Sequence, residues 1–238
     1  EVTLTGFCMR TRGRSMTPQQ TFWLAAAGPL TNVLLAALCA CNAAVPAPAP
    51  TPAPAATPAV EAQPADALTL EEKVGQLFIV RPDALDLSLS QETINDAKAD
   101  GVTTVTNDMR RALQQYPVGG ICQFGKNIES PSQLARFNKD LQDASATPLF
   151  IAVDEEGGLI ARLANNDAFA LPRYASAAAV GASGDPEDAR AMGQTIGGYL
   201  RTYGFNMDFA PDADVNTNPD NPIIGTRAFS SDAAEAAD

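Results

Sequence analysis

Carboxylates that directly follow a buried strand are the first candidates for chemistry in this sequence. The apolar run 148–153 (P-L-F-I-A-V) has the composition of a strand covered on both faces, and Asp154, Glu155 and Glu156 follow it. A carboxylate in that place is costly unless it binds a ligand or pairs with a cation. Arg162 lies eight residues beyond Asp154, after a Gly-Gly turn that can fold it back toward the carboxylate.

A second acidic group follows another predicted strand and contains Asp208, Asp212 and Asp214. Arg227 is a candidate partner for these carboxylates. Paired carboxylates and arginines suit the recognition of sugar hydroxyls, because each carboxylate accepts two or more hydrogen bonds. Glycosidases use two carboxyl groups as acid and nucleophile, and Asp154 and Asp212 are candidates for these two roles. Capping and ion pairing are the structural alternative for Asp154 and Arg162 and the expected role of Glu156, Asp208, Asp212 and Asp214. The spacing of the acidic residues matches no calcium loop.

The composition excludes several other classes of site. The chain has no histidine, so 238 residues hold no Ser-His-Asp triad, no Cys-His pair and no histidine-ligated metal. With 28 acidic and 16 basic side chains, its net charge of −12 argues against binding to nucleic acid. Cys122 stands in an apolar run and is predicted to be a small core residue.

The stretch 1–41 has the pattern of an export signal. Three arginines precede a mostly apolar segment, 22–40, which Gly28 and Pro29 interrupt. The segment ends in L-C-A-C, which resembles a bacterial lipobox and predicts lipidation at Cys41, with Cys39 as the second choice. The sequence thus predicts an exported, membrane-anchored envelope lipoprotein. A plain secretory signal, or upstream sequence that is not translated, is the alternative.

The stretch 42–67 is predicted to be an extended linker. Eighteen of the 25 residues from 43 to 67 are Ala or Pro. Such a segment buries too little apolar surface to offset the entropy lost on ordering, and alternating prolines favour the polyproline conformation.

From residue 68 onward strands and helices alternate. Thr69 and Glu72 form a capping-box pattern, and Val74, Leu77 and Phe78 are expected on the apolar face of the first helix. Strands are predicted at 78–80, 118–124, 148–153 and 205–210, and helices over 91–115 (divided near residue 101), 130–145 and 185–203.

This alternation predicts parallel βαβ units of an α/β fold. Four strands fit the N-terminal half of a (β/α)8 TIM-type barrel or a small doubly wound sheet. The first strand is followed by no Gly-rich phosphate loop, which favours the barrel. In such barrels functional residues lie at the C-terminal ends of the strands, where both acidic groups of this sequence stand.

Five stretches of the chain form an ordered set of motifs: L-T-L-E-E-K-V-G-Q-L-F (68–78), G-G-I-C-Q-F-G-K-N-I (119–128), F-I-A-V-D-E-E-G-G (150–158), G-F-N-M-D-F-A-P-D-A-D-V (204–215) and N-P-I-I-G-T-R-A-F-S-S-D (221–232). They resemble glycoside hydrolase family 3, and the last is similar to its β-N-acetylhexosaminidase branch in particular. The resemblance covers 68–238 and identifies it as the N-terminal part of the family's catalytic domain.

The resemblance implies a retaining exo-hydrolase that removes terminal non-reducing β-linked N-acetylglucosamine, often from peptidoglycan fragments. By motif position, Asp154, Arg162 and Arg227 would bind the sugar in the −1 subsite. The family's usual motif is D-Q-E-G-G-R, whereas this chain carries Glu155 and Leu159 at the second and sixth places. These departures bear on the ion pairing around Asp154.

The resemblance places the catalytic residues outside this chain. In the family a histidine acts as general acid/base and a later aspartate as nucleophile, and both come after the stretches found here. The implied mechanism is double displacement through a covalent glycosyl-enzyme, with no cofactor and no metal. A β-glucosidase or xylosidase of the same family, and a non-catalytic carbohydrate-binding lipoprotein, are the alternatives.

Overall fold

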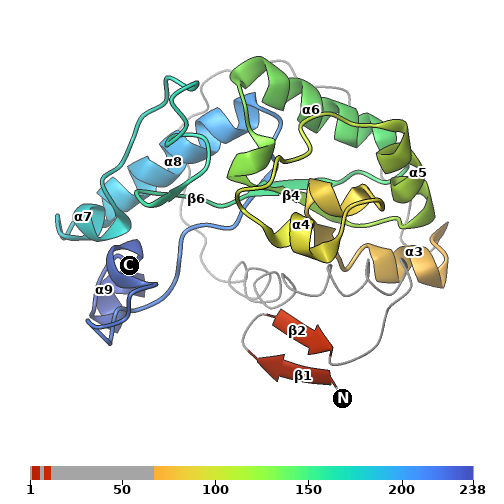
Figure 1. Cartoon of the computed structure of the whole chain (residues 1–238). Helices are drawn as coiled ribbons and strands as arrows, with labels where there is room; N and C mark the ends of the chain where they lie inside the picture. Colours follow the sequence, from red (N-terminus) through yellow and green to blue (C-terminus); the bar gives the residue numbers. More distant parts are fainter. Residues whose placement is uncertain (1, 6–7, 12–66, 238) are drawn as a thin grey trace.

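The computed structural model describes residues 2–5, 8–11 and 67–237 (Figure 1). Near the N-terminus, β1 (Val2–Thr5) pairs with β2 (Cys8–Thr11) in an antiparallel hairpin. The rest of the predicted signal segment, with both candidate lipidation cysteines, lies outside the described residues, and so does almost all of the predicted linker.

A four-stranded parallel sheet forms the centre of the structure. Its strands follow the chain in the order β3 (Ile79–Val80), β4 (Gly120–Gln123), β5 (Phe150–Val153) and β8 (Met207–Asp208). Parallel pairing is continuous across the sheet, from Ile79 opposite Gly120 to Val153 opposite Asp208. The predicted parallel α/β arrangement is therefore confirmed. The last strand is shorter than predicted, because β8 lies at the sheet edge and only two of its residues are paired with β5.

The longer helices lie over one face of this sheet (Figure 1). They are α5 (Asn107–Gln115), α6 (Pro131–Ala144) and α8 (Pro186–Thr202). The shorter ones are α3 (Leu70–Gly75), α4 (Gln91–Asn95), α7 (Ala177–Gly181) and α9 (Ala233–Ala237), together with the 3-10 turns η2 (Pro82–Leu85), η3 (Gly125–Asn127) and η4 (Gly225–Arg227). The predicted division of 91–115 is confirmed, since α4 and α5 are separate helices.

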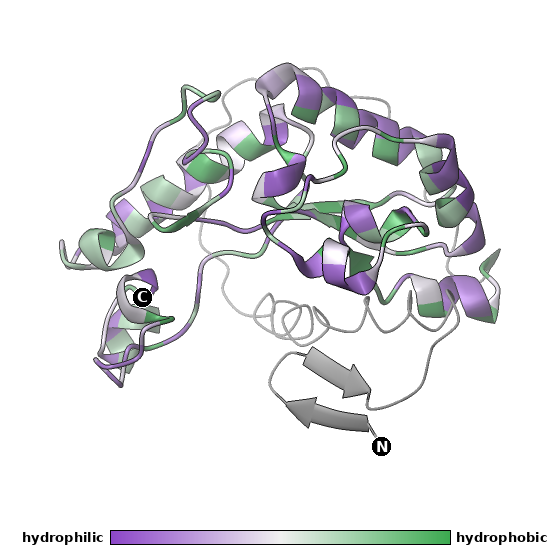
Figure 2. Ribbon diagram, in the orientation of Figure 1, coloured by the Kyte–Doolittle hydropathy of each residue, from purple (hydrophilic) through white to green (hydrophobic). Residues whose placement is uncertain are grey.

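Period-two alternation gives the sheet two apolar faces. Ile121, Ile151 and Val153 point into the large core beneath the helices, whereas Cys122 and Ala152 belong to a smaller cluster on the opposite face. The predicted burial of Cys122 is confirmed, because only 5% of the residue is exposed. On α6, the predicted inward residues Leu134, Phe137 and Leu141 are all buried, and apolar and polar faces alternate along the helices in Figure 2.

The first helix confirms its predicted cap but not its predicted apolar face. The Thr69 hydroxyl accepts the Glu72 N–H, and the Glu72 carboxylate accepts the Thr69 N–H. However, Val74 is 40% exposed and Leu77 is 65% exposed. The prediction was wrong for Leu77 because α3 ends at Gly75, so this residue no longer lies on a helical face.

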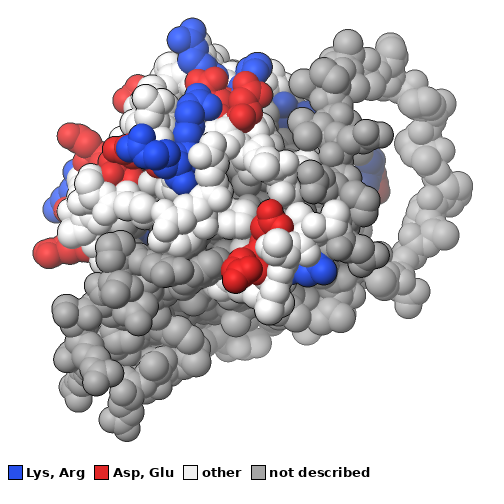
Figure 3. Space-filling view, turned by 90° about the vertical axis from the view of Figure 1, so that its right-hand side faces the viewer, with Lys and Arg blue, Asp and Glu red and all other residues white. Residues whose placement is uncertain are grey.

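Charged side chains of both signs are interspersed on the face shown in Figure 3. Exposed pairs such as Arg111 with Asp108 and Lys139 with Asp143 follow helical spacing, and pairs of this kind contribute little to stability. Within the described residues, no helix has the length and apolar character needed to cross a membrane.

Candidate functional site

The C-terminal ends of all four strands meet at one edge of the sheet, because the strands are parallel. Arg81 follows β3, Phe124 follows β4, Asp154 follows β5, and Asp208 ends β8. Burial, and to a smaller extent the charges of Asp154 and Asp208, raise the pKa of the thiol of Cys122 on the middle strand β4, whereas Arg81 acts in the opposite direction. The side chains after different strands therefore share one electrostatic environment.

Asp154 and Arg162 form an ion pair at this edge. Arg162 Nη2 lies 3.3 Å from Asp154 Oδ2, and the two side chains are 29% and 27% exposed. The chain returns through a small hairpin of β6 (Glu155–Gly157) and β7 (Ile160–Ala161), in which Gly157 and Gly158 have φ angles of 86° and 61°. Left-handed backbone of this kind favours glycine, so the predicted fold-back of Arg162 through the Gly-Gly turn is confirmed.

One nitrogen of the Arg162 guanidinium is left without a hydrogen-bond partner. This nitrogen is Nε, which is buried. The guanidinium carbon also lies 6.0 Å from the centre of the Phe124 ring, while that of Arg81 lies 4.2 Å from the same ring. Cations over an aromatic face are held by its quadrupole. Phe124 therefore supports two arginines at the strand ends, and neither Phe124 nor Arg81 was predicted as part of the site.

Glu155 is completely buried although it stands next to Asp154. Its Oε2 accepts the Leu163 N–H at 2.8 Å, and its Oε1 accepts the Ala164 N–H at 2.9 Å and the Tyr199 hydroxyl at 2.8 Å. Three donors thus stabilise the buried carboxylate. Burial, followed by the charge of Glu155, raises the pKa of Tyr199 well above its usual range.

Arg227 contacts two carboxylates from different parts of the chain. Its Nε and Nη2 donate to the two oxygens of Glu156 at 2.8 and 2.7 Å, and Nη2 also lies 3.0 Å from Asp212 Oδ2. The Asp212 contact is an ion pair without hydrogen-bond geometry. Hydrogen bonding to Glu156 raises the pKa of Arg227. The predicted pairing of Arg227 with an acidic group is confirmed, and most of its donors face protein rather than open space.

Asp208 carries a perturbed carboxyl group. Its Oδ1 accepts the Glu155 N–H at 3.0 Å. Burial raises the pKa of Asp208 to about 7; the Glu155 N–H acts against this shift, and the charges of Glu155, Asp154 and Glu156 add to it. At neutral pH this group is near half protonation, which lets it donate as well as accept a hydrogen bond.

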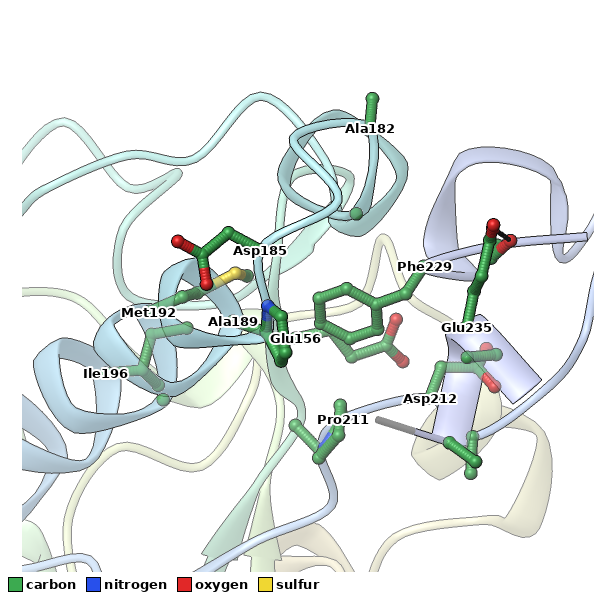
Figure 4. A pocket seen from close by; sticks show the side chains of 18 of the residues that line it. Glu156, Ala182, Asp185, Ala189, Met192, Ile196, Pro211, Asp212, Phe229 and Glu235 are labelled. Carbon is green, nitrogen blue, oxygen red and sulfur yellow. Dashed lines mark hydrogen bonds between the residues drawn. The ribbon is translucent and has the colours of Figure 1, made fainter. Parts of the chain in front are cut away.

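A cavity of about 720 Å³ lies beside this group, between α8 and the C-terminal segment. In Figure 4 Met192 and Ile196 lie on one side of it and Asp212 and Glu235 on the other, with Glu156 and Phe229 between them. Neither Asp154 nor Arg162 lines this cavity. Arg227 does not line it either, although its partners Glu156 and Asp212 do. The cavity and the Asp154–Arg162 pair are therefore neighbouring but separate features.

Residues 69–238 match the family model described as the glycosyl hydrolase family 3 N-terminal domain. The chain belongs to this family. β-Hexosaminidase A of Pseudoalteromonas piscicida is 34% identical over 146 residues, which cover 59% of this chain and 24% of that protein. The β-hexosaminidase of Thiobacillus denitrificans is 35% identical over 135 residues, covering 55% of this chain and 36% of the relative.

A solved structure shows the same relationship for this family 3 chain. The family 3 β-N-acetylglucosaminidase from Paenibacillus sp. str. FPU-7 is 35% identical with a TM-score of 0.57, and the match covers 72% of this chain and 29% of that one. The predicted resemblance to the hexosaminidase branch is confirmed by these relatives. The chain spans only about a quarter to a third of the length of the relatives that it matches.

Some contacts of this family 3 site agree with the sequence-based expectations and others could not be predicted. The expectation that Glu156 and Asp212 are ion-paired is confirmed by their contacts with Arg227. The place of Glu155 was not predicted, because its donors lie eight, nine and 44 residues away. Within the part of the chain that the structure describes, no group of three or more acidic or cysteine side chains is placed to hold a metal.

Proposed function

We propose that this chain is part of a retaining β-N-acetylhexosaminidase that releases terminal non-reducing N-acetylglucosamine. The names of the β-hexosaminidase relatives and of the β-N-acetylglucosaminidase structure support this activity. The observation that carries the proposal is the Asp154–Arg162 pair at the carboxyl end of β5, where α/β barrels bind substrate.

Asp154 and Arg162 are proposed to hold the sugar in the −1 subsite. The pair leaves Asp154 Oδ1 to accept hydrogen bonds from sugar hydroxyls. Both side chains are partly exposed, so a ligand can reach them. Arg227 is proposed to line the same subsite through the Nη1 hydrogen that its bond to the Ile223 carbonyl leaves over, since Nε and Nη2 are taken by Glu156.

The chemistry is proposed to be double displacement. A carboxylate attacks the anomeric carbon while a general acid protonates the leaving oxygen, and water then hydrolyses the glycosyl-enzyme. This chain has no histidine, so the histidine acid/base and aspartate nucleophile that the resemblance implies are proposed to come from sequence beyond it. The role of the present residues is to bind and orient the sugar.

Architecture and location are part of the same proposal. The strand order β3-β4-β5-β8, which follows the chain, is that of successive barrel strands and supports a half (β/α)8 barrel. The signal segment at 1–41, lipidation at Cys41 and the linker at 42–67 are proposed from sequence pattern alone. Together they give an exported enzyme tethered to a membrane of the cell envelope, with access to carbohydrate substrates.

The test is an assay of the full gene product, meaning the longest product of the reading frame that contains this chain, expressed without residues 1–41. It is incubated in parallel with p-nitrophenyl β-N-acetylglucosaminide and p-nitrophenyl β-glucoside. We expect selective release of p-nitrophenol from the first. Preference for the glucoside, or cleavage of neither, would contradict the proposed activity.

A further inference from the structure

We propose that Glu155 is a positioning residue of the sugar site, whose buried carboxylate holds the turn after β7 so that Arg162 stays against Asp154. The inference rests on the proposed function, because it takes the Asp154–Arg162 pair as the place where sugar binds. It assigns a role to the residue at which this chain departs from the usual family motif.

Two of the Glu155 hydrogen bonds come from the turn that follows Arg162. Leu163 and Ala164 are the two residues that directly follow Arg162, and both of their N–H groups donate to Glu155, at 2.8 and 2.9 Å. Glu155 itself directly follows Asp154. The carboxylate therefore joins the backbone next to one member of the ion pair to the backbone next to the other.

Such a link is needed because the rest of the connection is weak. Between the two residues the chain forms a hairpin of two very short strands, with an irregular register between Glu155 and Gly157. A two-residue strand supplies few ladder hydrogen bonds, and such hairpins are marginal alone. The two bonds to Glu155 supply the long-range restraint that this hairpin lacks.

The donors around Glu155 are matched to a carboxylate. Three donors converge on its two oxygens, and no cation is ion-paired with it among the described residues. A glutamine in the same place offers one acceptor oxygen, and its NH₂ group then faces Leu163 N–H or Ala164 N–H. A methionine of similar shape offers no acceptor and leaves buried N–H groups unpaired.

Glu155 also connects this turn to the rest of the strand-end region. Its Oε1 accepts the hydroxyl of Tyr199 on α8, and its backbone N–H donates to Asp208 on the neighbouring strand. One fully buried residue thus fixes the hairpin, a long helix and the edge strand relative to one another. The distance between Arg162 and Asp154 depends on the two bonds to Leu163 and Ala164, whereas the Tyr199 bond joins Glu155 to α8.

The experiment uses the full gene product with Glu155→Gln and Glu155→Met, and Tyr199→Phe as the matched control. Amide hydrogen exchange over 160–166 reports the turn, with exchange in α6 as the internal reference. Steady-state kinetics with p-nitrophenyl β-N-acetylglucosaminide report the sugar site. Tyr199→Phe removes one hydrogen bond from the same carboxylate but leaves both bonds to the turn in place.

For Glu155→Gln we expect exchange at the turn to rise about tenfold, the change given by one lost hydrogen bond, with α6 unchanged. The KM is expected to rise about threefold and kcat to change by less than about twofold, because Arg162 acts in binding. Glu155→Met is expected to show larger changes in the same direction. Tyr199→Phe is expected to match the wild type in both measurements.

Wild-type exchange at the turn and wild-type KM in Glu155→Gln would overturn the inference, and this variant keeps the size and most of the hydrogen bonding of the original. Failure of the proposed function is distinguishable. A wild-type protein that cleaves no glycoside would contradict the proposed activity. Amide exchange at 160–166 would still support or overturn the proposal that Glu155 holds the turn. Loss of active protein with an unchanged KM would indicate a merely structural role and would also overturn the inference.

Discussion

Arg227 and Glu156 are joined by two parallel hydrogen bonds although 71 residues separate them in the chain. The contact fastens the segment before α9 to the hairpin that carries Arg162. Because the Glu156 side chain is only 8% exposed, the ion pair with Arg227 is needed to stabilise its buried charge. Lysine cannot form the same two-point contact, since its ammonium is a single point charge.

We therefore expect Arg227→Lys to lower the free energy of unfolding by about 2 kcal/mol and Arg227→Ala by about 3 kcal/mol. Chemical denaturation of the full gene product measures both. Arg190→Ala is the matched control, because the Arg190–Glu187 pair is exposed and its removal is expected to leave stability nearly unchanged. Equal losses of stability from the substitutions at positions 190 and 227 would contradict the stabilising role of the Arg227–Glu156 contact.

The raised pKa of Asp208 predicts that the free energy of unfolding falls as pH rises. Its pKa is raised to about 7 in the folded protein, chiefly by burial, whereas an unfolded Asp titrates near about 4. Between these values the folded state binds more protons than the unfolded state, so the contribution of Asp208 to stability falls as pH rises from about 4 to 7. Above that window the penalty is constant.

Asp208→Asn removes this penalty while keeping an oxygen that accepts the Glu155 N–H. Relative to wild type, the variant is expected to gain stability as pH rises, reaching up to about 4 kcal/mol at pH 8. The charges of Glu155, Asp154 and Glu156 also raise the pKa of Asp208, so the difference between the two proteins is the informative quantity. A difference that does not change from pH 4 to pH 8 would show that Asp208 titrates normally.

Gly158 is expected to tolerate no side chain. Its φ is 61°, and a Cβ there would lie 2.8 Å from the backbone Cα of Ser176. Gly158→Ala should therefore destabilise the protein by about 2 kcal/mol and raise KM for the glycoside, because the hairpin that returns Arg162 must shift. Thermal denaturation and steady-state kinetics give the two values.

Gly198 supplies the control for that substitution. It lies within α8, and a Cβ there would meet no atom within 4 Å. Gly198→Ala is expected to stabilise the protein by about 0.5 to 1 kcal/mol and to leave KM unchanged. If both alanines raise KM alike, the conformation at Gly158 does not set the sugar site.

Local pattern made much of the fold predictable. The apolar run that forms β5, the Thr69 cap and the inward residues of α6 depend on neighbours within a few positions, so the sequence contains their cause. Asp154 and Arg162 were also predicted together, because they are only eight positions apart and a Gly-Gly turn lies between them.

Contacts across long sequence separations were not predictable in this way. The partner of Arg227 depends on how β8 and the segment after it cross the sheet edge, and no local pattern fixes that path. The burial of Glu155 runs against the usual exposure of glutamate, and it follows from a tyrosine on α8. Such residues are set by tertiary packing and not by propensity.

The central claim is that the Asp154–Arg162 pair binds the sugar, and Asp154→Ala tests it most directly. Asp167→Ala is the matched control, because Asp167 pairs with Arg173 but is 95% exposed. In the full gene product we predict that kcat/KM for p-nitrophenyl β-N-acetylglucosaminide falls about 100-fold in Asp154→Ala and stays within about twofold in Asp167→Ala. Asp154→Ala with wild-type kcat/KM would contradict the account.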